Sequence, residues 1–276
     1  MPELPEVETV VRDLRACGLV GLQIMSAHVF WPRSVAAPAP ARLPAAIRGN
    51  QIIGLSRRGK FIRVDLSGKA DLLIHLRMTG RLYVAPAERP ATGKTYDRVV
   101  FALSDGRRLC FSDPRKFGRV WLVDNPDVLL DRLGPEPLAL PRATFVHRLT
   151  ARSRTLKPLL MDQAFIAGIG NIYADEALWA AQIHPQRKSD SLSTEEAARL
   201  YRAIRTVLRR GIRNLGTSLG AGHTNFRLPR GVPGRNREHL CAYGQTGLPC
   251  QRCHTPIVRL LVGQRATHIC PACQRL

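Results

Sequence analysis

The stretch LKPLLMDQAFIAGIGNIYADEALWAAQI, residues 156–183, decides the fold of the second half of this chain. Its apolar residues recur at helical spacing on both sides of a glycine-containing break, which predicts two helices joined by a tight turn. A third helix is predicted for SLSTEEAARLYRAIRTVLRRGI (191–212), which opens with a capping box between Ser193 and Glu196. Two helices joined by a glycine-rich turn and followed by a third form an arrangement that binds nucleic acid when it is basic.

The charge of the chain indicates a polyanionic partner. There are 42 Lys and Arg against 21 Asp and Glu, a formal net charge of +21. From residue 201 onward thirteen Arg accompany a single acid, Glu238, and codon bias toward Arg does not by itself remove acids. Nucleic acid is favoured over a membrane surface. No apolar run reaches membrane-spanning length and the N-terminus carries acids, so neither a transmembrane helix nor a signal peptide is expected.

Upstream, the residues change to a β-type pattern. The segment PEVETVVRDLRA (5–16) predicts a helix with Val7, Val10, Val11 and Leu14 on one face. Short β-rich runs follow at 60–68, 70–85, 97–113 and 118–124, and Asp105-Gly106 is a hairpin signal. This half is predicted to be a β-sandwich or barrel with one N-terminal helix. Segment 36–46 is expected to be a loop or weak helix, and the proline-rich 132–141 a linker.

Four cysteines near the C-terminus have the spacing of a metal site. Cys250 and Cys253 form one C-x2-C pair, and Cys270 and Cys273 form a second, sixteen residues later. This spacing predicts a tetrahedral four-thiolate Zn²⁺ site, and a redox pair or two disulfides are the alternatives. Four thiolates leave no open coordination position, so a single structural zinc is expected.

The N-terminus can supply a nucleophile. Removal of Met1 would leave Pro2 with a free secondary amine beside the carboxyl group of Glu3. An α-amino group titrates near pH 8, so roughly a tenth of it is unprotonated at neutral pH. Such an amine can attack an electrophilic carbon and form a Schiff-base-type adduct, while the acid moves a proton. A frayed terminus without function is the alternative.

Several motifs together resemble one family over nearly the whole chain and in the same order. They are MPELPEVETV, RRGKF, IHLRMTG, SDPRKFG, LGPEPL, KPLLMDQ..IAGIGNIYADE and the four-cysteine ribbon. The chain thus resembles the bacterial formamidopyrimidine-DNA glycosylases of the Fpg/Nei family. Leu4 in PELPE favours the oxidised-purine branch over the oxidised-pyrimidine branch.

The resemblance implies roles for particular residues. Pro2 matches the nucleophile that attacks C1′ of the damaged nucleotide, and Glu3 matches the acid that activates the sugar. Lys60 matches the lysine beside the reacting sugar and phosphate, and Arg265 the arginine of phosphate binding and δ-elimination.

The resemblance also implies contacts with DNA. Met78, Arg115 and Phe117 match the side chains that fill the space left by an extruded base, which chemistry on a duplex base requires. Asn171 matches a phosphate-gripping turn, and the residues matching further backbone contacts are His75, Arg154 and Lys157. Tyr96 and Arg98 stand where the family has two histidines, and both can hydrogen-bond a phosphate.

One segment departs from the family pattern. Residues 217–240 lie where the family has its lesion-capping loop, but the usual Asp-Gly-x-x-Gly-x-Phe run is missing. The segment is rich in Gly, Pro and Arg, so we expect it to bury little and to be poorly ordered without DNA.

The sequence therefore predicts an α+β protein. We expect an N-terminal β-sandwich domain with a catalytic N-terminal helix (1–131), a linker (132–141), a helix-two-turn-helix domain (142–240) and a zinc ribbon (241–276). The predicted function is a glycosylase and AP lyase that removes oxidised purines from damaged double-stranded DNA in base excision repair. An oxidised-pyrimidine glycosylase and a non-catalytic zinc-ribbon DNA-binding protein are the alternatives. We expect a monomer in the bacterial cytoplasm, associated with the nucleoid and not with a membrane.

Overall fold

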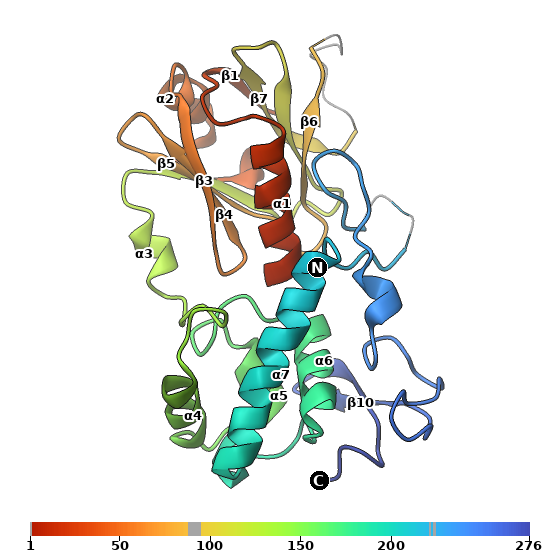
Figure 1. The fold of residues 1–276 in the computed structure, drawn as a ribbon. Helices are drawn as coiled ribbons and strands as arrows, with labels where there is room; N and C mark the ends of the chain where they lie inside the picture. The colour runs from red at the N-terminus through yellow and green to blue at the C-terminus, as the bar shows by residue number, and fades with distance from the viewer. Residues whose placement is uncertain (1, 88–94, 221, 223–224) are drawn as a thin grey trace. The chain divides into compact units, whose positions relative to one another are not determined.

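The chain divides into two compact units, each described here by itself. The computed structural model describes residues 2–87, 95–220, 222 and 225–276. The first unit comprises Met1–Asp131 and Asn214–Arg235, and the second Arg132–Arg213 and Asn236–Leu276 (Figure 1). The predicted domain boundary at 131 coincides with the division between units. Residues 214–235 cluster with the first unit, although the sequence places them in the 142–240 domain.

Two β-sheets, in which most neighbouring strands are antiparallel, form the body of the first unit. A four-stranded sheet has the order β1-β7-β8-β6, and a five-stranded sheet has the order β2-β9-β5-β4-β3. The strands are β1 Ile24–Val29, β2 Val35–Ala37, β3 Ile52–Arg58, β4 Phe61–Leu66, β5 Asp71–His75, β6 Arg81–Ala85, β7 Asp97–Leu103, β8 Arg108–Ser112 and β9 Arg119–Val123. Gly106 adopts a positive φ of 84° in the turn between β7 and β8, as the hairpin signal predicts.

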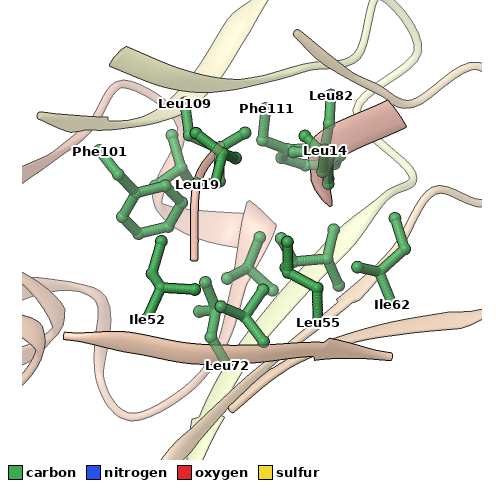
Figure 2. Packing of buried hydrophobic residues seen from close by; sticks show 14 of the residues in the cluster. Leu14, Leu19, Ile52, Leu55, Ile62, Leu72, Leu82, Phe101, Leu109 and Phe111 are labelled. Carbon is green, nitrogen blue, oxygen red and sulfur yellow. The ribbon is translucent and has the colours of Figure 1, made fainter. Parts of the chain in front are cut away.

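The core of the first unit lies between these sheets. Figure 2 shows Phe101, Leu109 and Phe111 of one sheet facing Ile52, Leu55 and Leu72 of the other. All are buried, and removing one such side chain from water contributes about 1.5–3 kcal/mol. The sandwich predicted from the alternating runs is therefore confirmed.

Helix α1 (Leu4–Ala16) packs on β3 and β4 of the first unit. Val7, Val10, Val11 and Leu14 are buried in the same core, as their helical spacing predicts. Short elements η1 (Pro32–Ser34), η2 (Pro40–Arg42), α2 (Leu43–Ile47) and α3 (Asp127–Leu130) complete the unit. The weak helix expected within 36–46 corresponds to η2 and the start of α2.

Segment 214–235 returns to the first unit. Phe226 and Leu228 are buried in the core of the sandwich. The Ser218 hydroxyl accepts a hydrogen bond from Gly234 N–H at 2.9 Å, which closes the segment on itself. The expectation that residues 217–240 bury little is wrong for their described part, because two apolar side chains two positions apart both face the core. Poor order of this segment without DNA stays a prediction. Residues 221, 223 and 224 lie outside the described residues.

Helices dominate the second unit. They are α4 Arg142–Thr150, α5 Leu156–Met161, α6 Asn171–Ala181 and α7 Thr194–Arg213, with η3 Ser189–Ser191 and η4 Asn236–His239. The predicted capping box starts α7, since Ser193 N–H donates to Glu196 at 2.9 Å and Glu196 N–H donates back to Ser193 at 3.2 Å. Helices α6 and α7 lie side by side (Figure 1). Gly211 allows this approach, because a Cβ there would lie 2.4 Å from the Tyr173 hydroxyl oxygen.

The remaining parts of the second unit are attached to these helices. The predicted linker 132–141 is held on α7, where the Tyr201 hydroxyl donates to Leu140 O at 2.9 Å. Strands β10 (Val258–Val262) and β11 (Arg265–Ile269) form the hairpin between the cysteine pairs. No helix in the described part of the chain is both long and apolar enough to cross a membrane.

Candidate active site and zinc site

Residues Pro2 and Glu3 directly precede the first turn of α1. Glu3 is the N-cap residue, and its N–H donates to Glu6 Oε2 at 2.8 Å. The other oxygen of Glu6 accepts a hydrogen bond from Thr217 N–H, also at 2.8 Å. One carboxylate therefore ties the start of α1 to the returning segment 214–235. Sequence reasoning missed this role, although the three-residue spacing of Glu3 and Glu6 is a capping-box signal.

Lys60 lies in the two-residue turn between β3 and β4, where Arg58 pairs with Phe61. Gly59 precedes it with a φ of 56°, a conformation that glycine adopts at little cost. The adjoining strand is tied to α1 because Arg57 Nε lies 3.1 Å from Glu8 Oε2, and Arg57 Nη1 donates to Gly59 O at 3.0 Å. Burial alone would raise the pKa of Glu8, but the hydrogen bonds and charges of Arg12 and Arg57 outweigh it and hold that pKa below its usual value.

His75 ends β5 opposite Phe61 of β4. Burial and the nearby positive charges of Arg77 and Lys60 lower the pKa of His75 to about 3. Its Nδ1 accepts a hydrogen bond from Arg77 N–H at 3.0 Å. A neutral ring with Nδ1 as acceptor carries its proton on Nε2. The side chain can therefore present an N–H donor, as a phosphate contact requires.

Met78, Arg115 and Phe117 are brought together, as the resemblance implies. Arg115 Nη1 lies 3.5 Å from Met78 Sδ, and the Arg115 guanidinium lies 4.7 Å from the centre of the Phe117 ring. Met78 and Phe117 keep 43% and 46% of their surface exposed. Two apolar side chains with a cation between them are thus presented to solvent on neighbouring turns.

Tyr96 and Arg98, which the sequence predicts to contact phosphate, differ in orientation. Tyr96 is exposed, so its ring is accessible. Arg98 is buried, and its Nε donates to Asp113 O at 2.8 Å. This inward contact favours a structural role for Arg98, and its phosphate contact stays a prediction.

In the second unit, a turn built on two glycines precedes α6. Gly168 has a φ of 91°, and its N–H donates to the side chain of Gln163 at 2.9 Å. Gly170 is the N-cap, and Asn171 is the first residue of the helix. Helix N-termini favour anions because their first N–H groups have no partner within the helix. The arrangement suits the phosphate contact predicted for Asn171.

The two basic residues near α5 have different environments. Arg154 is half exposed and lies 2.7 Å from Asp162. Lys157 has no exposed side-chain surface, and its Nζ lies 2.6 Å from Asp175 Oδ1. The same Nζ donates to Ala266 O and to the Thr267 hydroxyl, both at 2.8 Å. A fully buried ammonium argues against the direct backbone contact that the sequence predicts for Lys157.

Arg265 is exposed at the start of β11, directly after the turn of the hairpin. Gly263 and Gln264 form that turn with φ values of 54° and 61°. The buried Lys157 bonds the next two residues of β11, Ala266 and Thr267. Arg265 is thus carried on a strand that is fixed to α5 from inside the unit.

The four cysteines form one cluster. The Sγ atoms of Cys250, Cys253, Cys270 and Cys273 all lie within 4.8 Å of one another. Sulfur atoms about 2.3 Å from a tetrahedral zinc ion lie about 3.8 Å apart, so the cluster fits one such ion. No disulfide joins any of the four in the structure, which favours the metal site over the two disulfides considered from the sequence. These residues would hold a structural zinc that fixes the hairpin bearing Arg265.

Comparison with known proteins gives matches to three family models. The formamidopyrimidine-DNA glycosylase N-terminal domain matches residues 1–120, the H2TH domain of the same proteins matches 133–221, and the zinc finger found in FPG and IleRS matches 247–276.

Whole-chain relatives agree with these matches. A formamidopyrimidine-DNA glycosylase of Herpetosiphon aurantiacus is 49% identical, with 99% of this chain and 100% of that protein covered. One from Protochlamydia amoebophila is 42% identical, and both chains are fully covered. A solved complex of Lactococcus lactis Fpg with DNA containing an abasic site matches with a TM-score of 0.90 at 34% identity, covering 99% of this chain and 100% of that one. The chain belongs to the formamidopyrimidine-DNA glycosylase family.

Proposed function

We propose that this protein is a bifunctional DNA glycosylase and AP lyase that removes oxidised purines, such as formamidopyrimidines and 8-oxoguanine, from duplex DNA. The observation that carries the proposal is the start of α1, where Pro2 and Glu3 directly precede a helix held by Glu6. The family match over the whole chain supports it. Relatives of the chain include a mutant of Lactococcus lactis Fpg in complex with DNA containing Fapy-dG.

In this mechanism the Pro2 nitrogen is the nucleophile. Once Met1 is removed, a secondary amine with a pKa near 8 is partly unprotonated at neutral pH. Its lone pair forms a bond to C1′ while the bond from C1′ to the damaged base breaks and the base leaves with a proton. Displacement leaves an aminal, in which C1′ is bonded to both the Pro2 nitrogen and the ring oxygen of the sugar. The bond from C1′ to the ring oxygen then breaks as that oxygen takes the proton that Glu3 delivers, which gives the iminium ion on Pro2, the Schiff-base intermediate of the reaction.

Glu3 and Lys60 assist by moving protons and stabilising charge. Glu3 delivers its proton to the ring oxygen of the sugar, which allows the ring to open. Lys60 supplies a fixed cation beside the anionic backbone. The iminium ion acidifies the adjacent C2′ proton, and loss of that proton expels the 3′ phosphate. A second elimination, the δ-elimination, expels the 5′ phosphate. Arg265 binds this phosphate.

The basic side chains hold damaged double-stranded DNA, the partner of the reaction. His75 donates from Nε2, and Arg154 and the first turn of α6 at Asn171 bind further phosphates. Met78, Arg115 and Phe117 occupy the space of the extruded nucleotide. The enzyme acts as a monomer at the nucleoid of a bacterial cell.

Borohydride trapping tests the nucleophile. The protein is incubated with an abasic-site duplex and borohydride, and the reduced adduct is located by mass spectrometry. We expect the adduct on Pro2. A variant that retains Met1 should lose trapping but keep DNA binding, because its Pro2 nitrogen is an amide. An adduct on Lys60, or none at all, would overturn the assignment, and binding without any adduct would support the non-catalytic alternative.

Single-turnover excision tests the base preference. Duplexes with 8-oxoguanine and with an oxidised pyrimidine are compared at equal salt. Faster excision of 8-oxoguanine supports the purine assignment. The reverse order would assign the protein to oxidised pyrimidines instead.

A further inference from the structure

Asp113 is a buried carboxylate that joins two separate turns of the first unit. Its side chain has no exposed surface. Oδ2 accepts hydrogen bonds from Phe117 N–H and Gly118 N–H, each at 2.7 Å. Oδ1 accepts from Arg115 N–H at 3.1 Å and from the Thr79 hydroxyl. Three donors thus belong to the turn at 113–118, and the fourth belongs to the turn at 75–80.

Both turns hold a strained residue immediately before an exposed apolar side chain. Arg77 has a φ of 53° and precedes Met78, and Lys116 has a φ of 62° and precedes Phe117. A non-glycine residue in this left-handed region is unfavourable and persists only when the surrounding contacts enforce it. His75 Nδ1 fixes the first turn through Arg77 N–H. Asp113 fixes the second through its three backbone donors.

The contact between Asp113 and Thr79 is the buried connection between these turns. On the surface, Arg115 touches both Met78 and the Phe117 ring. An exposed contact of this kind is weak, whereas a buried hydrogen bond to a charged group is roughly twice as strong as a neutral one. The relative position of Met78 and Phe117 therefore depends mainly on the buried hydrogen bond between Thr79 and Asp113.

We infer that Asp113 and Thr79 are positioning residues, which hold Met78, Arg115 and Phe117 as one preassembled wedge for the space vacated by an extruded nucleotide. The inference rests on the proposed function. When the wedge is already assembled, the two turns need not become ordered as it enters the duplex. The loss of conformational entropy on ordering therefore does not slow base extrusion. If the link is broken, each turn can still fold, but the two apolar side chains enter independently.

The test uses Thr79→Val, which keeps the side-chain shape and removes the hydroxyl. Insertion of the wedge is followed by the fluorescence of 2-aminopurine placed next to the lesion in a duplex. We expect insertion and lesion excision to slow about tenfold, the effect of losing one hydrogen bond to a charged group. Thr79→Ser should restore both rates. Thr150→Val is the matched control, because it also loses a hydroxyl hydrogen bond, to Val146 O within α4 of the second unit.

A double-mutant cycle separates coupling from simple loss of stability. In the wild-type background, Met78→Ala and Phe117→Ala should be strongly non-additive in the insertion rate, and in the Thr79→Val background they should become additive. Global destabilisation would not change this coupling. Additivity in both backgrounds, or a Thr79→Val insertion rate equal to that of the wild type, would overturn the inference.

A single-stranded abasic oligonucleotide distinguishes this failure from failure of the proposed function. It has no duplex for a wedge to enter, so borohydride trapping on it should be equal for wild type and Thr79→Val. If the wild type traps neither single-stranded nor duplex substrate, the proposed function fails. If it traps both and Thr79→Val does not differ on the duplex, only the wedge inference fails.

Discussion

Substitution of Lys157 by methionine should destabilise the second unit strongly without removing a contact to DNA. Lys157 and Asp175 both have no exposed side-chain surface, and their charged atoms lie 2.6 Å apart. Removal of one partner from a buried ion pair costs about 3–5 kcal/mol, because the remaining charge is uncompensated. Asp175 keeps the His268 backbone N–H and lies 3.0 Å from His268 Nδ1, so we expect the lower end of this range. About 3 kcal/mol corresponds to a fall in Tm of roughly 10 °C for a unit of this size.

Thermal unfolding and salt-dependent binding measured on the same variants check this prediction. Lys157→Met should lower Tm but leave the slope of log Kd against log salt unchanged. Lys157→Met with Asp175→Asn should recover much of the stability, because the double variant buries no unpaired charge. Arg154→Ala is the matched control: its exposed pair with Asp162 contributes at most about 1 kcal/mol, and a lost phosphate contact would reduce the slope by about 0.9. A stable Lys157→Met variant with a reduced salt slope would refute the reasoning and restore the direct phosphate contact.

Three further predictions concern the zinc site, the neutral histidine and the returning segment. Cys250→Ser should lose zinc and DNA affinity together, checked by metal analysis and binding, because the hairpin that carries Arg265 loses its frame; full affinity without metal would contradict this. The pKa of His75 is about 3 in the folded protein against an ordinary 6.5, so its contribution to stability is present above pH 6.5 and is lost as the pH falls toward 3. The free energy of unfolding in urea should fall in this pH range for the wild type and not for His75→Gln. If the two proteins show the same dependence on pH, His75 makes no such contribution. Arg230→Ala should slow 8-oxoguanine excision and cleavage of a preformed abasic site to a similar extent, because Arg230 holds segment 214–235 on α1 through Asp13 and both reactions use Pro2 and Glu3 at the start of that helix; a loss confined to 8-oxoguanine in single-turnover assays would instead show a role specific to the lesion.

Short sequence patterns were sufficient to predict the structure wherever the contacts are local. The capping box at Ser193, the hairpin at Gly106 and the four-cysteine cluster each depend on residues close in sequence or on a fixed spacing, and all three are confirmed. The order of strands in the two sheets could not be predicted in the same way. Strand β1, for example, pairs with β7 across more than seventy positions, and no short pattern encodes such a partner.

Lys157 illustrates why burial of a charge cannot be predicted locally. In LKPLL it follows the ordinary rule that lysine is exposed. Its partners are Asp175 on α6 and Thr267 on β11, and the second is 110 positions away. Only the tertiary structure brings these two acceptors together with the third, Ala266 O, and so makes burial of the ammonium tolerable.

The burial within residues 217–240 was not predicted, for a different reason. The composition of this segment is that of a disordered chain, but composition does not record that Phe226 and Leu228 both reach the core. One charged side chain within it also has a fixed partner, since Arg230 N–H donates to Asp13 Oδ2 at 3.0 Å and Arg230 Nε to Asp13 Oδ1 at 2.6 Å.

These contacts show how segment 214–235 holds helix α1 in this chain. Asp13 is buried near the C-terminal end of α1, where the helix dipole disfavours an acid, so a cation from outside the helix is required. Arg230 supplies it. At the other end of the same helix, Glu6 binds Thr217 N–H of the same segment. Segment 214–235 therefore contacts α1 at both ends of the helix. These two contacts restrain the helix, which begins beside Pro2 and Glu3, from sliding or rotating on the sheet. Arg230 thus holds the helix that follows Pro2 and Glu3, a role that phosphate attraction alone would not require.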